Sequence, residues 1–254
     1  MKTVSVALLA IATIAAAANP QEASTHRTLI LFDLSGSMTP PGPLLTADLH
    51  PHWIAEINRA LKALGAKLRT DDRICLGSFA SRILISPKCS RGGPADLEEL
   101  FRGLDQQGSP SPIGSAVWSG VEMMAAQKQG GVRDVIVVVS DGQTSGNQHP
   151  TSEVAAFAKA NGVTVHAVQT LPAAWGTANA PTKARAYRLL QSLAESTGGT
   201  VSECQRTSSR FDCEKPRGGL ATALGKILGQ GAVATPQTVD DQLSVRGVPR
   251  LRAP

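Results

Sequence analysis

Aromatic side chains are scarce in this sequence of 254 residues, where they make up 4% of the chain and include a single tyrosine. Grooves that bind sugars or single-stranded nucleic acids depend on stacking against such rings, so the composition argues against both functions. The formal net charge of +5 is modest, and the basic residues are dispersed along the chain. Since tracking a phosphate backbone needs a dense basic cluster, we expect no nucleic-acid partner.

Beyond its first 20 residues the chain has no apolar run long enough to cross a membrane. Those first residues, MKTVSVALLAIATIAAAANP, place Lys2 before a short apolar run that ends in small residues. This is the pattern of a secretory signal peptide, and we expect residues 1–18 to be removed. The mature protein would then have no membrane span and be exported, either to a periplasm or out of the cell.

The chain has four cysteines but no Cys-x-x-Cys motif, and the cysteine spacings do not repeat, which argues against a zinc site. In an oxidising compartment two disulfides are the default. Cys75 and Cys89 are neighbours in the sequence, as are Cys204 and Cys213. Four cysteines nevertheless allow three pairings, and the sequence alone does not choose among them.

Segments typical of strands and of helices alternate along the chain. Apolar runs predict strands at 27–35, 72–80, 81–88, 133–142 and 163–171, with a short edge strand at 200–204. Apolar residues at helical spacing predict helices at 53–68, 94–104, 110–128, 151–162, 184–199 and 218–231. This alternation predicts an α/β fold with a doubly wound, mostly parallel sheet and helices on both faces. No apolar period survives beyond residue 231, so residues 231–254 are expected to be a flexible tail.

One apolar run, LILFDLSGSM at residues 29–38, ends in a carboxylate followed by two hydroxyls. Asp33, Ser35 and Ser37 leave the strand at its carboxyl end, where alternate side chains can converge on one point. Ser111 precedes a predicted helix, and Asp141 ends another predicted inner strand. Ligands of open parallel sheets bind beyond the carboxyl ends of the strands, so these five residues form one candidate site. Their oxygen donors suit magnesium, manganese or calcium.

With these three segments in this order, the chain resembles a von Willebrand factor type A (VWA) domain over about residues 26–230. That family has a metal-ion-dependent adhesion site made of Asp-x-Ser-x-Ser, a threonine before a central helix, and Asp-Gly after a later strand. Here Ser111 stands where threonine is usual, which keeps the oxygen and loses the stiffening methyl group. The resemblance implies that Ser35, Ser37 and Ser111 contact the metal, while the two aspartates act directly or through water. Mg²⁺ is the expected ion, with Mn²⁺ or Ca²⁺ also compatible.

The resemblance also implies a binding function. Two carboxylates and three neutral hydroxyls leave a divalent ion about neutral, with a coordination position open to solvent. In adhesive members of the family an aspartate or glutamate of a partner protein fills that position. We therefore expect a VWA domain at residues 19–230 that binds an acidic side chain of a protein partner. The alternative is a metal-independent structural or scaffold domain.

An enzyme is the less favoured hypothesis. Phosphatases of the haloacid dehalogenase class also carry an aspartate at the end of a first inner strand, but they need a second aspartate two residues later, where this chain has Ser35. No Gly-x-Ser-x-Gly segment indicates a serine hydrolase, and the five histidines show no partner pattern. We expect no catalysis, and a metal-dependent phosphohydrolase is the enzymatic alternative.

Overall fold

The computed structural model describes residues 25–38, 50–68, 71–91, 95–97, 99, 110–172, 180–206, 211–213 and 219–229. The expected signal peptide at 1–18, most of the expected helix at 94–104 and the expected tail at 231–254 lie outside these residues. Within the described part of the chain, no helix has both the length and the apolar character needed to cross a membrane.

The described strands form one seven-stranded sheet with the order β3-β2-β1-β4-β5-β6-β7. The strands are β1 (Thr25–Asp33), β2 (Arg73–Phe79), β3 (Ile83–Ser90), β4 (Val132–Ser140), β5 (Val163–Pro172), β6 (Val201–Arg206) and β7 (Phe211–Cys213). The five inner strands are parallel, whereas β3 and β7 pair antiparallel at the two edges. The expected mostly parallel sheet is confirmed, and β7 is a strand that the sequence pattern did not predict.

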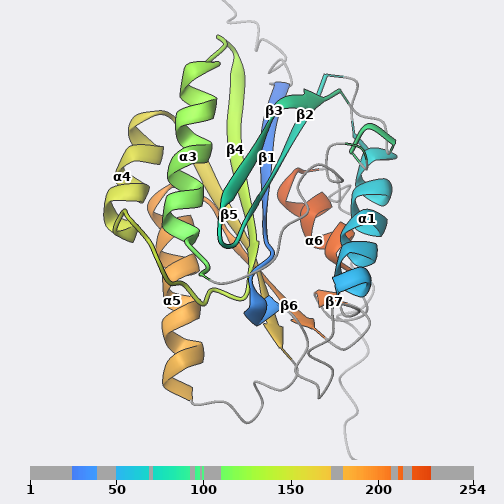
Figure 1. Cartoon of the computed structure of the whole chain (residues 1–254). Helices are drawn as coiled ribbons and strands as arrows, with labels where there is room; N and C mark the ends of the chain where they lie inside the picture. Colours follow the sequence, from blue (N-terminus) through green and yellow to red (C-terminus); the bar gives the residue numbers. More distant parts are fainter. Residues whose placement is uncertain are drawn as a thin grey trace, which may run out of the picture.

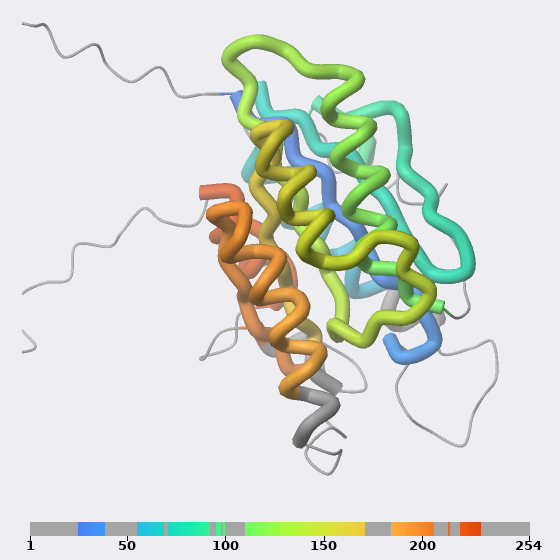
Figure 2. The backbone as a smooth tube through the Cα atoms, turned by 90° about the vertical axis from the view of Figure 1, so that its left-hand side faces the viewer, coloured from blue at the N-terminus to red at the C-terminus, as the bar shows by residue number. Residues whose placement is uncertain are grey.

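Helices cover both faces of the sheet, as expected for a doubly wound fold (Figure 1). One face carries α3 (Ile113–Ala126), α4 (Thr151–Ala160) and α5 (Ala180–Ser196), which stand in front of the strands in Figure 2. The other face carries α1 (His50–Gly65) and α6 (Leu220–Ile227). A short 3₁₀ turn, η1 (Gly36–Met38), begins three residues after the last residue of β1.

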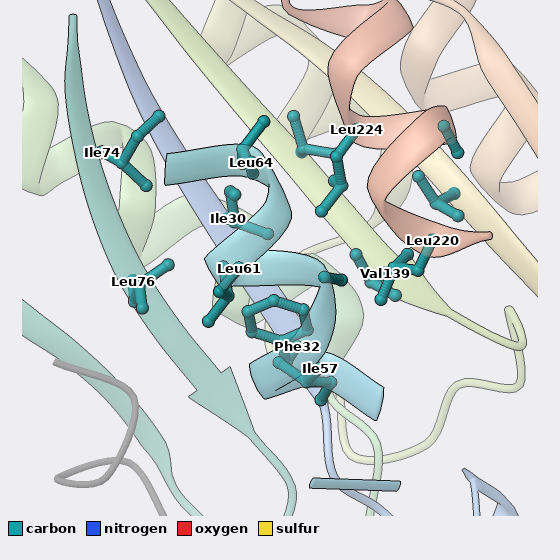
Figure 3. Packing of buried hydrophobic residues seen from close by; sticks show 14 of the residues in the cluster. Ile30, Phe32, Ile57, Leu61, Leu64, Ile74, Leu76, Val139, Leu220 and Leu224 are labelled. Atoms are coloured by element: carbon teal, nitrogen blue, oxygen red, sulfur yellow. The ribbon is translucent and has the colours of Figure 1, made fainter. Parts of the chain in front are cut away.

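The sheet separates two hydrophobic cores, which explains why its inner strands are continuous apolar runs. On β1, Leu29 and Leu31 pack on the α3 side, while Ile30 and Phe32 pack on the α1 side, and all four are fully buried. Helix α1 faces the sheet with apolar residues at helical spacing. Figure 3 shows Ile30 and Phe32 packed among side chains of α1 and α6, namely Ile57, Leu61, Leu64, Leu220 and Leu224.

Each antiparallel edge hairpin is tied by a disulfide. Cys75 on β2 bonds to Cys89 on β3, and Cys204 on β6 bonds to Cys213 on β7. In both cases the bonded cysteines are direct partners in the strand register. The expectation of two disulfides is confirmed, and the chain uses the pairing of sequence neighbours.

Candidate metal centre

The carboxyl ends of β1 and β4 place two aspartates at the same edge of the sheet. Asp33 is the last residue of β1, and Asp141 follows Ser140, the last residue of the adjacent parallel strand β4. Ser35 lies two residues after the end of β1, where its amide donates to Asp33, and Ser37 lies in η1 just beyond it. Figures 1 and 2 show η1, the start of α3 and the loop after β4 meeting at this end of the molecule.

Asp33 is the centre of a buried hydrogen-bonded cluster. Its Oδ2 accepts bonds from the hydroxyls of Ser111 at 2.8 Å and Ser140 at 2.6 Å, and its Oδ1 accepts one from the Ser35 amide at 2.9 Å. The Ser35 and Ser37 hydroxyls lie 3.1 Å apart. Burial raises the pKa of Asp33 above its ordinary value, and the hydrogen bonds from Ser140, Ser35 and Ser111 offset only part of this effect.

The loop between β4 and α4 holds Ser111 in place from the opposite side. The Ser111 carbonyl accepts bonds from the Ser145 amide at 3.0 Å and the Thr144 hydroxyl at 2.9 Å, and the Ser111 amide donates to Ser145 Oγ at 3.2 Å. Helix α3 has no side-chain cap of its own, but the Gly114 amide in its first turn donates to Asn147 Oδ1 at 2.9 Å. The position of Ser111 therefore depends on residues more than 30 positions later in the chain.

The turn that carries Asp141 requires a glycine. Asp141 is fully buried, and its Oδ1 accepts a bond from the Gln143 amide at 2.9 Å. Gly142 adopts φ of 80°, and a Cβ at this position would lie 2.6 Å from the backbone oxygen of Ala186 on α5. Any other residue would strain the turn and push it from α5. The Asp-Gly pair thus fixes both the buried carboxylate and its approach to the helix.

The structure brings together the five residues singled out in the sequence. Asp33, Ser35, Ser37 and Ser111 are linked by hydrogen bonds, and Asp141 is the next residue after Ser140, which also bonds to Asp33. Sequence reasoning missed a second set of residues that hold the first, namely Ser140, Thr144, Ser145 and Asn147. The only sequence signal for these residues is a short polar stretch around Asp141-Gly142, and such a stretch predicts no more than an ordinary turn.

The donors in this cluster fit a hard divalent cation. In the described part of the chain, no group of three or more His, Cys, Asp or Glu side chains could hold a metal ion. The cluster instead combines two buried carboxylates with three hydroxyls, a set of oxygen ligands that suits Mg²⁺, Mn²⁺ or Ca²⁺ and disfavours the softer metals. The buried Asp33 carboxylate also favours a bound positive charge, since burial disfavours its ionised form and raises its pKa.

Comparison with known families gives the class of the protein. The model of the von Willebrand factor type A domain matches residues 29–209, so the chain belongs to the VWA family. This match contains all five residues of the cluster. Among curated proteins, no relative matches the chain.

Solved structures share the fold at low sequence identity. The conserved hypothetical protein BatB from Bacteroides thetaiotaomicron is 17% identical with a TM-score of 0.55, covering 81% of this chain and 98% of that one. An aerotolerance-related membrane protein from Bacteroides fragilis is 17% identical with a TM-score of 0.52, and the match covers 81% of this chain and 97% of that one. The pilus adhesin SpaC from Lactobacillus rhamnosus GG is 15% identical with a TM-score of 0.53, and the match covers 74% of this chain and 28% of that one. These likenesses show a common fold.

Proposed function

We propose that this VWA domain binds a divalent cation and, through it, an acidic side chain of a protein partner. Asp33, Ser35, Ser37, Ser111 and Asp141 would hold the ion, with Mg²⁺ the simplest choice and Mn²⁺ or Ca²⁺ compatible. Once bound, the ion supplies an electrophilic coordination position that a carboxylate can fill. The observation that carries the proposal is the buried oxygen cluster around Asp33, built from three separate segments of the chain.

The exposure of the cluster indicates where a partner approaches. Asp33, Ser35, Ser111 and Asp141 are buried, whereas Ser37 is partly exposed and follows the exposed Gly36. An incoming carboxylate therefore reaches the centre along η1. The buried side chains are held by hydrogen bonds before any ligand arrives, so ordering them adds little to the cost of binding.

Further features favour an exported interaction module. The sequence begins with a signal-peptide pattern at 1–18, and the described part contains two disulfides, which persist in oxidising compartments. We propose that residues 19–230 form the VWA domain of a periplasmic or secreted protein and that residues 231–254 are a tail. An adhesin among the proteins of similar fold is consistent with a binding role. On this proposal the protein has no catalytic activity.

Calorimetric titration of Mn²⁺, standing in for Mg²⁺, tests the metal site directly. The protein would be residues 19–254, and concentrations would reach the millimolar range. We expect binding to one site, with no heat in Asp33→Ala. Glu153→Gln is the matched control because it removes one carboxylate from the exposed face of α4, and it should bind as the wild type does.

Each other outcome favours a different function. Absence of heat in the wild type would leave the metal-independent scaffold as the better description. Binding that survives Asp33→Ala would mean that the ion lies elsewhere. Metal-dependent turnover of a generic phosphate ester, lost in Asp33→Ala, would favour the phosphohydrolase.

A further inference from the structure

A cleft of about 440 Å³ opens beside the candidate metal centre. Its walls are the turn between β2 and β3 at residues 81–83, the outer side of α3, and the loop between β4 and α4. Pro110 and Pro112 also line the cleft, and they flank Ser111 on both sides. The cleft therefore borders the segment that carries Ser111, which bonds to Asp33 in the candidate metal centre.

One wall of the cleft is a fixed stack of rings. Trp118 lies between His149, with ring centroids 4.0 Å apart, and Phe157, with centroids 4.1 Å apart. The Trp118 indole N–H donates to Glu122 Oε1 at 3.0 Å. Since both faces of the indole are covered, Trp118 offers a rigid edge and no stacking surface. An aromatic or sugar ligand, which needs such a surface, is disfavoured here.

The rest of the lining is suited to a peptide backbone with an acidic side chain. Ser119 and Gln148 supply hydrogen-bonding groups along the cleft, as an extended segment needs for its amides and carbonyls. Arg82 is exposed on the turn between β2 and β3 and forms no ion pair with the described residues. Among the described residues that line the cleft, Glu122 is the only one with a carboxylate, and it already accepts a hydrogen bond from the Trp118 indole N–H. Within the part of the chain that the structure describes, the cleft thus presents the positive charge of Arg82 without an ion-pair partner.

We propose that this cleft takes an extended segment of the partner, contiguous with the acidic residue at the metal centre, and that Arg82 pairs with a second acidic residue of that segment. The inference rests on the proposed function, because the first acidic residue must be held at the centre. Two observations select this occupant: the continuity of the cleft with the Ser111 loop and the charge of Arg82. The formal net charge of +5 also favours an acidic partner.

The test uses short capped peptides of glycine and serine in saturating Mg²⁺ with residues 19–254. One peptide carries a single glutamate, and the others add a second glutamate one to four positions away on either side. Binding is followed by the Trp118 indole N–H signal in a ¹H–¹⁵N spectrum, which Trp118→Phe assigns. We expect one spacing to shift this signal and to lower Kd about two- to fivefold relative to the single-glutamate peptide, as an exposed ion pair would.

Two arginine variants distinguish a local ion pair between Arg82 and the second glutamate from a general attraction between the protein's net charge and an acidic peptide. Arg82→Gln should remove the gain from the second glutamate while leaving the single-glutamate Kd unchanged. Arg133→Gln is the matched control, because it removes the same charge from an exposed residue near the start of β4, at the opposite end of the sheet. In Arg133→Gln the second glutamate should still lower Kd as it does in the wild type.

The outcomes distinguish the two proposals. If neither Mg²⁺ nor Mn²⁺ binds, the proposed function fails, and this inference fails with it. If the metal binds but no second glutamate lowers Kd, or the gain survives Arg82→Gln, the cleft assignment is overturned while the metal centre stands. An unmoved Trp118 signal at millimolar peptide, with the metal bound, would overturn it equally.

Discussion

At the scale of single residues, Ser111 is the side chain that joins the separate parts of the centre. Its hydroxyl donates to Asp33 across 78 positions of sequence. On the proposed function, we expect Ser111→Ala to weaken Mn²⁺ binding at least about tenfold, since it removes both a proposed oxygen ligand and a charge-assisted hydrogen bond of about 1.5–3 kcal/mol. Ser111→Thr keeps the hydroxyl and should bind close to wild type. Calorimetry would measure both, with Ser152→Ala on the exposed face of α4 as the control. Equal affinity in Ser111→Ala would remove Ser111 from the centre.

Gln169 is a buried side chain whose polar atoms have no hydrogen-bond partner among the described residues. It is fully buried on β5 and pairs in register with Ser140, the residue that holds Asp33. An unpaired buried polar group costs about 1–3 kcal/mol, so Gln169→Met, of similar volume, should stabilise the fold by about that amount. Urea unfolding measures the change, with the exposed Gln127→Met expected within about 0.5 kcal/mol of wild type. A loss of stability would instead indicate buried water held by the amide.

His166 on β5 should make stability depend on pH. Its Nδ1 accepts a hydrogen bond from the Thr200 amide at 3.1 Å, and burial lowers the pKa of His166 below 6.5. The unfolded chain therefore binds more protons than the folded one as pH falls through 6.5, and folding stability is lost there. We expect the drop in Tm from pH 7.5 to 5 to be smaller in His166→Asn than in the wild type. Parallel Tm curves would rule out this contribution.

The sequence singled out the five residues of the candidate centre but not the residues that hold them in place. Asp33 is the last residue of a strong strand and Ser35 and Ser37 follow it within four positions, so local pattern and topology suffice to place them. Ser140 reads as the end of an apolar run, and its role depends on the parallel pairing of β1 with β4. Asn147 caps α3 from a distant loop, a tertiary contact that no local pattern signals.

At the scale of elements, the long periodic segments were predicted well and their ends less so. Helix α1 begins at His50, three residues before the expected start, and α5 begins at Ala180, four before. Each helix therefore has a proline in its first turn, Pro51 or Pro181. Proline is tolerated there because an N–H at that position would have no partner within the helix. Strand β4 ends at Ser140, short of the expected 142, because Gly142 turns the chain. Strand β7 was not predicted because a strand of three residues is too short to show an alternation of apolar and polar side chains.

The disulfides at the two edges should contribute separately to the sheet. The Cys204–Cys213 bond closes a short loop on a three-residue edge strand. We expect Cys204→Ala/Cys213→Ala to cost about 3 kcal/mol in urea unfolding and to raise amide exchange in β6 and β7. The matched variant Cys75→Ala/Cys89→Ala, at the other edge, should cost a similar amount while β6 and β7 stay protected. Unchanged exchange in β7 without its disulfide would show that pairing with β6 alone holds this edge.

At the scale of the whole molecule, the centre joins elements from both halves of the sheet. Asp33 ends β1 in the middle of the strand order, Ser111 leads into α3, and Asp141 follows β4 and packs through Gly142 against α5. A ligand that bridges these segments binds the folded chain and not the unfolded one. Metal binding on the proposed function should therefore appear as stability of the entire domain.

The stabilisation that a bound ion gives the folded domain can be calculated from the ion concentration and its Kd. An ion present at one hundred times its Kd adds about 2.7 kcal/mol to the free energy of unfolding. For a domain of about 200 residues each kcal/mol corresponds to about 2–4 °C, so saturating Mg²⁺ or Mn²⁺ should raise Tm by about 5–10 °C. Differential scanning calorimetry with and without chelator measures the rise, which Glu153→Gln should keep and Asp33→Ala should lose. A rise that is the same in Asp33→Ala would mean that the ion stabilises the fold from another site, because that variant lacks the carboxylate to which Ser35, Ser111 and Ser140 all bind.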